Sequence, residues 1–241
     1  MSSAERESIL ANLGIVEGER RRRAAVAALG PRVVALKAFQ QRRFTRTYPD
    51  LLGADRYVAA CRFFLDELYG PDDYARRDAQ FAKMVSGLGT FFPPEVVHTV
   101  ARVAELHALS EVLDSAMAEQ LPAPQVAPVD YVRAWQAVGR APDRQRQIVL
   151  SLGVAETLDG LTRNPLLRKG LRLMRAPARV AGVYDLHRFV EVGFDAFAAM
   201  HGAHDFIATV RSREEAFAAA IFAADPAAAA AATAGALAAL A

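Results

Sequence analysis

The sequence has a single cysteine, Cys61, among its 241 residues. One cysteine excludes an internal disulfide framework and any zinc or iron–sulfur site built from several cysteines. No run of about 18 uncharged apolar residues occurs, so we expect no membrane-spanning helix. The N-terminus has no uninterrupted apolar segment, so we expect no signal peptide and a cytoplasmic location. The chain also lacks Gly-rich phosphate loops, Gly-x-Ser-x-Gly and His-Glu-x-x-His, which disfavours nucleotide-dependent and common hydrolytic chemistry.

What the sequence does contain favours helices. Hydrophobic residues make up 53% of the chain and charged residues 23%, which is the composition of a protein with a sizeable core. Alanine accounts for 50 residues, and arginine outnumbers lysine by 26 to 3. Alanine, leucine and arginine have high helix propensity, and no Asn-Gly or Asp-Gly hairpin turn is present. The composition therefore predicts an all-α fold.

Glycine, proline and capping residues divide the chain into about nine or ten predicted helices, which suits a compact multi-helix bundle. We expect a basic N-terminal helical arm over residues 1–48, a helical bundle domain over 49–225 and an alanine-rich flexible tail over 226–241. Residues 121–130 are rich in proline and predict a surface loop or a hinge. The predicted helices cover residues 3–29, 31–48, 54–69, 78–92, 95–120, 130–139, 143–161, 165–181, 184–200 and 203–224.

The formal net charge of +2 is a cancellation between blocks of opposite sign. Residues 1–48 carry a net charge of +6, residues 49–139 carry −6, residues 140–180 carry +6 and residues 181–241 carry −4. Blocks of opposite charge attract one another, so they are expected to meet either within the fold or across a dimer.

One histidine suggests a haem pocket. His107 lies on the long predicted helix, and a single helical histidine is how globins hold haem iron. Gln80 and Lys83 lie on the preceding helix, where a distal pocket belongs, and the helix order over residues 55–140 loosely resembles that of bacterial globins. The alternative is a polar stripe formed by His107, Glu111 and Asp114 at helical spacing. Composition and spacing leave the cofactor unknown.

A second group of histidines and carboxylates follows near residue 190. His187, Glu191 and Asp195 are spaced by four residues and share one helix face, with His201 and His204 at the end of that helix. Imidazole and carboxylate at this spacing are able to bind a transition metal, and we take His187, Glu191, His201 and His204 as the candidate ligands. The same residues also suit a solvent-exposed face opposite a row of phenylalanines.

Arginine clusters suggest binding of an anion. The stripe of Arg168, Arg172, Arg175 and Arg179 is the main candidate, facing either an anionic ligand or the acidic block 49–139 of the same chain. Two further clusters, residues 20–23 and 42–46, are of the kind that contacts phosphate backbones or anionic lipid headgroups. Four consecutive arginines point around most of a helix, however, which favours a solvated or dimer-contacting arm.

Four segments carry a family resemblance: RFFLDELYGPDDYARRDAQFAKMV, AELHALSEVLD, AVGRAPDRQRQI and FVEVGFDAFAAMHGAHDFIATVRSRE. Together they resemble a family of uncharacterised all-helical proteobacterial proteins with an FFLxELYGP-type segment. The resemblance covers about residues 35–215 and implies one helical architecture, but it implies no activity and no functional residue.

The function expected from the sequence is that of a non-catalytic cytoplasmic interaction or scaffold protein, with a protein partner or self-association as a homodimer. The basis is the charge pattern and the lack of a complete catalytic constellation. A ligand-binding helical protein with a haem or metal site is the alternative, and binding of nucleic acid or an anionic surface is a further one.

Overall fold

The computed structural model describes residues 1–68, 74–91, 94–122, 125–223, 225 and 228. In these residues it is all-helical, as predicted, and contains no strand. Ten of the described α-helices have at least seven residues, in agreement with the predicted nine or ten. The elements are α1 (Ser3–Ala25), α2 (Leu29–Thr47), α3 (Pro49–Leu52), α4 (Asp55–Phe63), the π-helix η1 (Phe64–Leu68), α5 (Ala75–Phe91), α6 (Pro94–Gln120), α7 (Pro128–Val138), α8 (Ala141–Thr162), α9 (Pro165–Leu173), α10 (Arg175–Val180), α11 (Tyr184–Ala199) and α12 (His204–Ala223).

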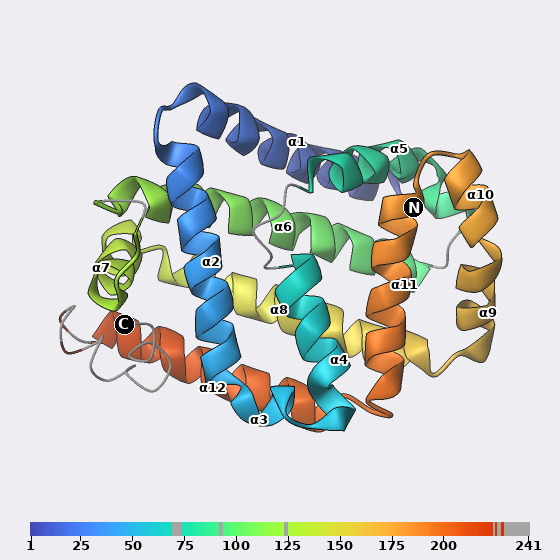
Figure 1. Ribbon diagram of the computed structural model, residues 1–241. Helices are drawn as coiled ribbons and strands as arrows, with labels where there is room; N and C mark the ends of the chain where they lie inside the picture. Colours follow the sequence, from blue (N-terminus) through green and yellow to red (C-terminus); the bar gives the residue numbers. More distant parts are fainter. Residues whose placement is uncertain (69–73, 92–93, 123–124, 224, 226–227, 229–241) are drawn as a thin grey trace.

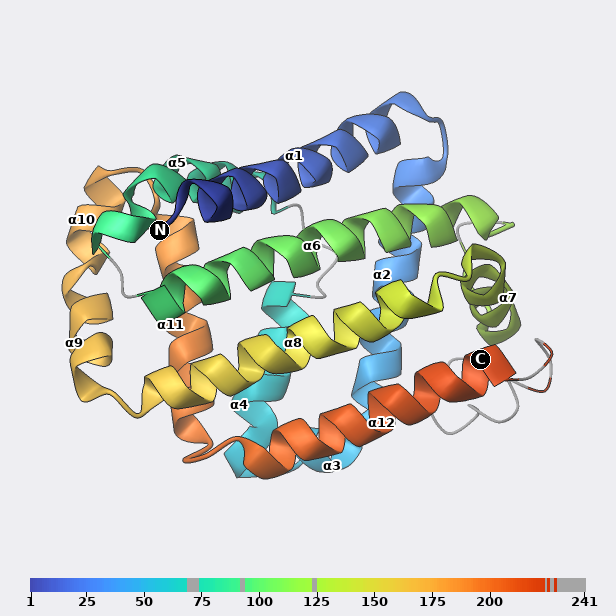
Figure 2. The same ribbon diagram turned by 180° about the vertical axis from the view of Figure 1, so that it is seen from behind.

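The long helices form two crossed layers. Helices α1, α6, α8 and α12 run side by side across the molecule in one layer (Figure 2). Helices α2, α4 and α11 cross them steeply on the other side (Figure 1). Helices α9 and α10 stand together along one edge, and α7 lies at the opposite end. Helix α6 contacts α1 and α2, so the predicted N-terminal arm lies against the bundle. The division at residue 48 stays a prediction.

Apolar side chains from both layers form the core. The largest cluster joins α2, α3, α4, η1, α8, α11 and α12, and a second joins α2, α6, α7 and α12. In the first cluster the ring of Phe64 lies 6.1 Å from that of Phe206 and 6.3 Å from that of Phe197. Cys61 is fully buried in the same cluster, as its position on the apolar face predicts. Burial raises the pKa of its thiol to about 11.

The first two helix boundaries differ from the sequence prediction. Ser2 caps α1: its hydroxyl accepts a hydrogen bond from the backbone of Glu5, and the Glu5 carboxylate accepts one from the Ser2 backbone. The chain turns at Ala28, which has a φ of 66°, so α1 ends before Gly30 and Pro31. Pro31 lies in the first turn of α2, where a missing N–H costs no helical hydrogen bond.

Two other predicted helices are interrupted. The helix expected over 54–69 changes to a π-helix after Phe63, and side chains from neighbouring helices bind its carbonyl oxygens: Gln41 binds that of Leu65, and Arg77 binds that of Glu67. The helix expected over 165–181 breaks at Met174 into α9 and α10. Pro177 explains this break, because its ring clashes with the carbonyl group four residues earlier in a continuous helix.

Some expectations fall on residues that the structure does not describe. These are the end, at residue 69, of the helix predicted over 54–69, part of the proline-rich linker, and all but position 228 of the predicted tail over 226–241. Among the described helices, none has the length and apolar character needed to cross a membrane.

Candidate functional site

The basic stripe of α9 and α10 faces the acidic stripe of α11. The Nε atom of Arg175 lies 2.9 and 2.8 Å from the two carboxylate oxygens of Glu191, and Nη2 of Arg168 lies 2.9 Å from Oδ1 of Asp195. The hydrogen bond from Arg175 lowers the pKa of Glu191, because it stabilises the ionised carboxylate. The arginine stripe and the acidic stripe of α11, which sequence alone presents as separate candidate sites, therefore partly neutralise each other's charge.

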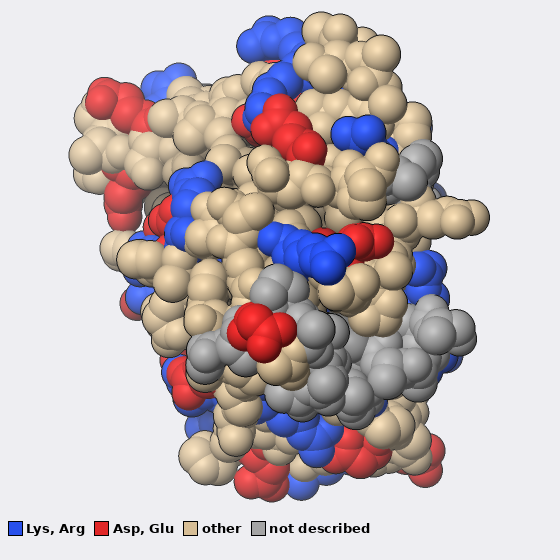
Figure 3. Space-filling view, turned by 90° about the vertical axis from the view of Figure 1, so that its left-hand side faces the viewer, with Lys and Arg blue, Asp and Glu red and all other residues tan. Residues whose placement is uncertain are grey.

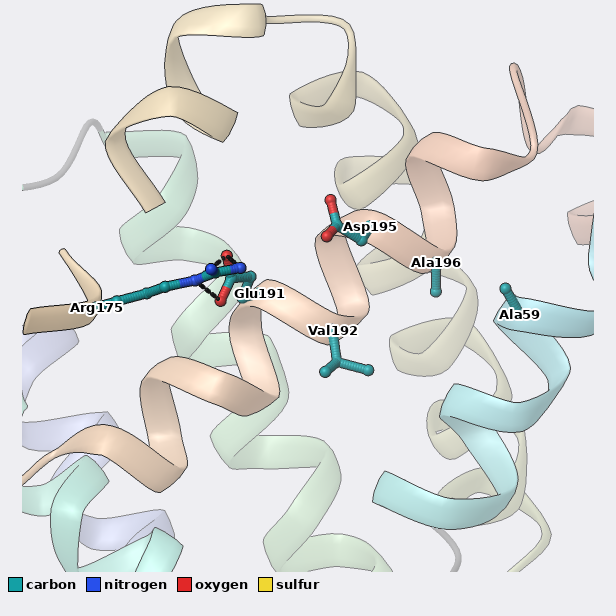
Figure 4. A pocket seen from close by; sticks show the side chains of 6 residues that line it. All are labelled: Ala59, Arg175, Glu191, Val192, Asp195 and Ala196. Carbon is teal, nitrogen blue, oxygen red and sulfur yellow. Dashed lines mark hydrogen bonds and ion pairs between the residues drawn. The ribbon is translucent and has the colours of Figure 1, made fainter. Parts of the chain in front are cut away.

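A shallow hollow lies beside these ion pairs. It has a volume of about 360 Å³ and is lined by the small side chains of α4 and α11 on one wall and by the charged residues on the other. Figure 4 shows Glu191, Val192, Asp195 and Ala196 along α11, Ala59 on α4, and Arg175 reaching from α10 to Glu191. Since Arg175 occupies the Glu191 carboxylate, the hollow presents a paired acid rather than a free one.

The outer side of α9 and α10 is basic and carries exposed apolar side chains. Leu166 is 71% exposed, Leu173 is 77% exposed and Val180 is 91% exposed. Lys169 and Arg172 lie between them, are exposed, and form no salt bridge with any residue that the structure describes. No aspartate or glutamate occurs between Asp159 and Asp185 in the sequence. We call α9 and α10 with these side chains the α9–α10 edge.

The opposite end of the molecule has a different surface. Figure 3 views it from the left-hand side of Figure 1, and there the blue and red side chains lie in small groups of both signs among uncharged residues. A surface of mixed charge is ordinary for a globular protein. The α9–α10 edge differs from such a surface, because it combines cations with projecting apolar side chains and has no acid of its own.

A second concentration of charge lies inside the bundle, where α1, α2 and α5 meet α6. Asp78 on α5 is only 8% exposed. Its Oδ2 atom lies 2.8 Å from Nε2 of His107 on α6 and 2.5 Å from Nη2 of Arg20 on α1. Burial opposes ionisation of Asp78, but the hydrogen bonds and charges of His107 and Arg20 outweigh it and lower the pKa of Asp78.

One turn further along α6, Glu111 binds two cations. Arg23 of α1 and Lys37 of α2 each contact its carboxylate, with Nζ of Lys37 2.5 Å from Oε1. Arg23 also donates hydrogen bonds to the Glu111 carbonyl oxygen, at 2.7 Å, and to the Ser115 hydroxyl, at 2.9 Å. Burial opposes ionisation, yet the positive charges of Lys37 and Arg23 hold the pKa of Glu111 at about 2. This cluster fixes α1 and α2 on α6.

The pKa of Asp114, the next acid along this face, is shifted in the opposite direction. Asp114 is 6% exposed and accepts a hydrogen bond from Nε2 of Gln40 at 3.0 Å. Burial raises its pKa, and the nearby negative charge of Glu111 acts in the same direction. The stripe of His107, Glu111 and Asp114 is therefore an internal polar seam of the bundle.

These pairs show how the charge blocks meet. Four of them join the basic block 1–48 to the acidic block 49–139, and Arg168 and Arg175 join the second basic block to the last acidic one. Arg43 also pairs with Glu214 through two hydrogen bonds, at 2.9 and 3.0 Å, joining the first block to the last. For these residues the attraction between blocks operates within the fold.

A family model described as a domain of unknown function (DUF8198) matches residues 19–228. The chain belongs to the DUF8198 family. This agrees with the resemblance to a family of uncharacterised helical proteins. The match spans the charge seam on α6 and the whole α9–α10 edge. Neither the curated proteins nor the solved structures contain a match to the chain.

The haem prediction places three residues in this DUF8198 domain, and the structure gives them different partners. His107 uses Nε2 to bind Asp78. Gln80 faces the start of α11, where it donates to Asp185 at 2.8 Å and accepts from the backbone N–H of Leu186 at 3.0 Å. Lys83 is exposed on α5. Neither of the two hollows described is lined by His107, so this geometry does not support an iron site there.

The predicted metal ligands are also divided. His187 binds the carbonyl oxygen of Leu171 through Nε2, at 2.8 Å, and Glu191 is held by Arg175. His201, with a φ of 52°, lines a second hollow of about 240 Å³ beside Asp159, and His204 is exposed at the start of α12. Within the described part of the chain, no group of three or more His, Cys, Asp or Glu residues is arranged to hold a metal ion.

Sequence reasoning missed the partners of the polar seam on α6. Asp78, Arg20 and Arg23 carry the seam, but Asp78 has no distinguishing spacing, and the two arginines appear only as part of a run. The i, i+4, i+7 spacing of His107, Glu111 and Asp114 on α6 was visible, whereas their burial depends on two helices that arrive from distant parts of the chain.

Proposed function

We propose that this DUF8198 protein is a non-catalytic docking protein that binds an anionic partner through the α9–α10 edge. The observation that carries the proposal is the pairing of exposed leucines with exposed cations on a segment without acids. In the clusters at residues 20–23 and 42–46, Arg20, Arg23 and Arg43 each bind a carboxylate of the same chain. Of the arginine stripe expected from the sequence, Arg172 is best supported as a contact for an external anion, together with the exposed Lys169 on the same helix.

Of the four arginines in the anion-binding stripe expected from the sequence, three make contacts within the protein. Arg168 and Arg175 hold carboxylates of α11, and the Arg179 guanidinium stacks on the ring of Tyr184, 4.7 Å from its centroid. These three residues position α9 and α10 on the bundle, while Lys169 and Arg172 make the contact. We propose that this docking takes place in the cytoplasm, the location expected from the sequence. Docking through the α9–α10 edge does not require self-association.

Binding to immobilised polyglutamate at about 50 and 500 mM salt tests this proposal, because charge contacts weaken as salt rises. We expect Lys169→Ser combined with Arg172→Ser to elute at clearly lower salt than the wild-type chain. The matched control combines Arg21→Ser with Arg46→Ser, two exposed arginines on α1 and α2, and removes the same charge elsewhere. Equal elution of the two variants would overturn the proposal, since it would show that net charge alone drives binding.

A further inference from the structure

We infer that the anionic partner of the α9–α10 edge is a phospholipid surface, into which the leucines of α9 insert. The inference rests on the proposed docking function and adds the class of partner. It starts from the spacing of Leu166 and Leu173, which are seven residues apart and so lie two turns apart on one face of α9. Lys169 lies between them on the sequence, and the face carries no acid.

The shape of the edge favours a lipid partner over a protein groove. Both views of the ribbon place α9 and α10 at the outer margin of the molecule (Figures 1 and 2). Leu173 at 77% and Val180 at 91% exposure project from that margin as separate side chains. A fluid acyl phase closes around each projecting side chain, whereas a folded partner needs a matching pocket for each. The larger described hollow is lined by α4, α10 and α11 and by none of these apolar side chains.

The charges fit the headgroup region of an anionic bilayer. Six basic residues lie between Asp159 and Asp185 in the sequence, and no acid is among them. The carboxylates of Glu191 and Asp195, on the adjoining helix, would repel lipid phosphates, but Arg175 and Arg168 neutralise them. Interfacial helices combine basic and apolar residues in this way, with the cations at the headgroups and the apolar face below them.

Nucleic acid fits the same edge less well. A phosphate backbone satisfies the cations but leaves exposed leucines without an apolar partner. Binding of single strands usually also needs aromatic side chains for stacking, and the α9 sequence PLLRKGLRL contains none. Tyr184, at the start of the adjoining α11, already stacks with Arg179.

Co-sedimentation of the full chain with vesicles tests the inference. Vesicles of 30% phosphatidylglycerol in phosphatidylcholine should bind the protein, and vesicles of phosphatidylcholine alone should not. Loss of two interfacial cations in Lys169→Ser/Arg172→Ser should weaken binding about 30-fold. Leu166→Ser/Leu173→Ser should weaken it about tenfold or more, because the inserted apolar area is lost. Val34→Ser/Val149→Ser removes two exposed valines on α2 and α8 and is the matched control, with binding expected to be unchanged.

A labelled cysteine separates insertion from simple charge attraction. Cys61 is buried with a pKa of about 11, so a thiol-reactive fluorophore at neutral pH labels a cysteine introduced by Leu173→Cys selectively. We expect a blue shift of that fluorophore on anionic vesicles and none for the label at Val149→Cys. If the leucine variant binds as well as wild type, or the label at position 173 does not shift, insertion is refuted.

The remaining outcomes separate this inference from the proposed function. Should the chain ignore vesicles but still bind polyglutamate through Lys169 and Arg172, the lipid inference is wrong and the docking proposal stands. Binding to a 20-base-pair DNA duplex in place of vesicles, through the same two residues, leads to the same conclusion. Failure on all three probes overturns both. Equal binding to neutral and anionic vesicles also refutes the inference.

Discussion

The sharpest stability prediction concerns Glu111→Gln. This substitution keeps the size of the side chain and removes its charge, which leaves Arg23 and Lys37 in the interface without their anion. The pKa of Glu111 falls from 4.5 to about 2 on folding. A shift of about 2.5 units corresponds to roughly 3 kcal/mol of stability at neutral pH, at about 1.4 kcal/mol per unit. Removing one partner of a buried ion pair costs a similar amount, about 3–5 kcal/mol.

The pH dependence gives this prediction a signature. Because the pKa of Glu111 is lowered in the folded state, its contribution is fully present above about pH 4.5 and is lost as the pH falls toward 2. Urea unfolding should therefore show Glu111→Gln to be about 3 kcal/mol less stable than wild type at pH 7. The difference between the two proteins should shrink steadily below pH 4.5.

A control on the same helix makes the test decisive. Glu119 also pairs with an arginine of α1, Arg22, but both side chains are 41% exposed. Glu119→Gln should cost less than about 1 kcal/mol, as exposed ion pairs usually do. If Glu111→Gln costs no more than Glu119→Gln at pH 7, or if its deficit does not change with pH, the reasoning about the buried seam is refuted.

Three further predictions concern two helical glycines and the buried thiol of Cys61. A Cβ at Gly193 would lie 2.8 Å from Cζ of the buried Phe63, so Gly193→Ala should lower the free energy of unfolding by about 1–2 kcal/mol. Thermal unfolding measures this change, and a melting temperature above that of the wild type would contradict it. Gly160→Ala meets no atom within 4 Å and should instead raise stability by up to about 1 kcal/mol. The thiol of Cys61 is buried, with a pKa of about 11, so Ellman's reagent at pH 8 should react only at the rate of unfolding. Rapid reaction of the folded protein would disprove the burial.

Local sequence signals predicted the helices well because helix starts and ends depend on neighbouring residues. Most expected boundaries lie within a few residues of those of the structure. The exceptions have tertiary causes. The π-helix after Phe63 is supported by Gln41 and Arg77, which belong to other helices. The placement of Gly30 and Pro31 inside α2 depends on the turn at Ala28, which no strong turn residue announces.

The candidate sites were predicted less well, because sequence spacing shows which residues share a helix face but not what that face meets. The stripe with Arg175 and the stripe with Glu191 were both visible, and their mutual pairing was not. The same limit applies to His107, whose partner Asp78 lies 29 residues earlier on a different helix. Charge blocks were the most useful long-range signal, since they indicated which parts of the chain attract each other.

The ion pair between Arg43 and Glu214 has a consequence for synthesis of the chain. The two residues are 171 positions apart, and Glu214 also accepts a hydrogen bond from the hydroxyl of the buried Tyr48. At about 5–20 residues per second, a ribosome delivers Glu214 roughly 10–30 s after Arg43. During that interval α2 has no α12 to pack against. The guanidinium of Arg43 must therefore stay hydrated, and the packing of the bundle cannot be completed. Among the helices that the structure describes, α12 is made last, and it completes the burial of α2, which is made second.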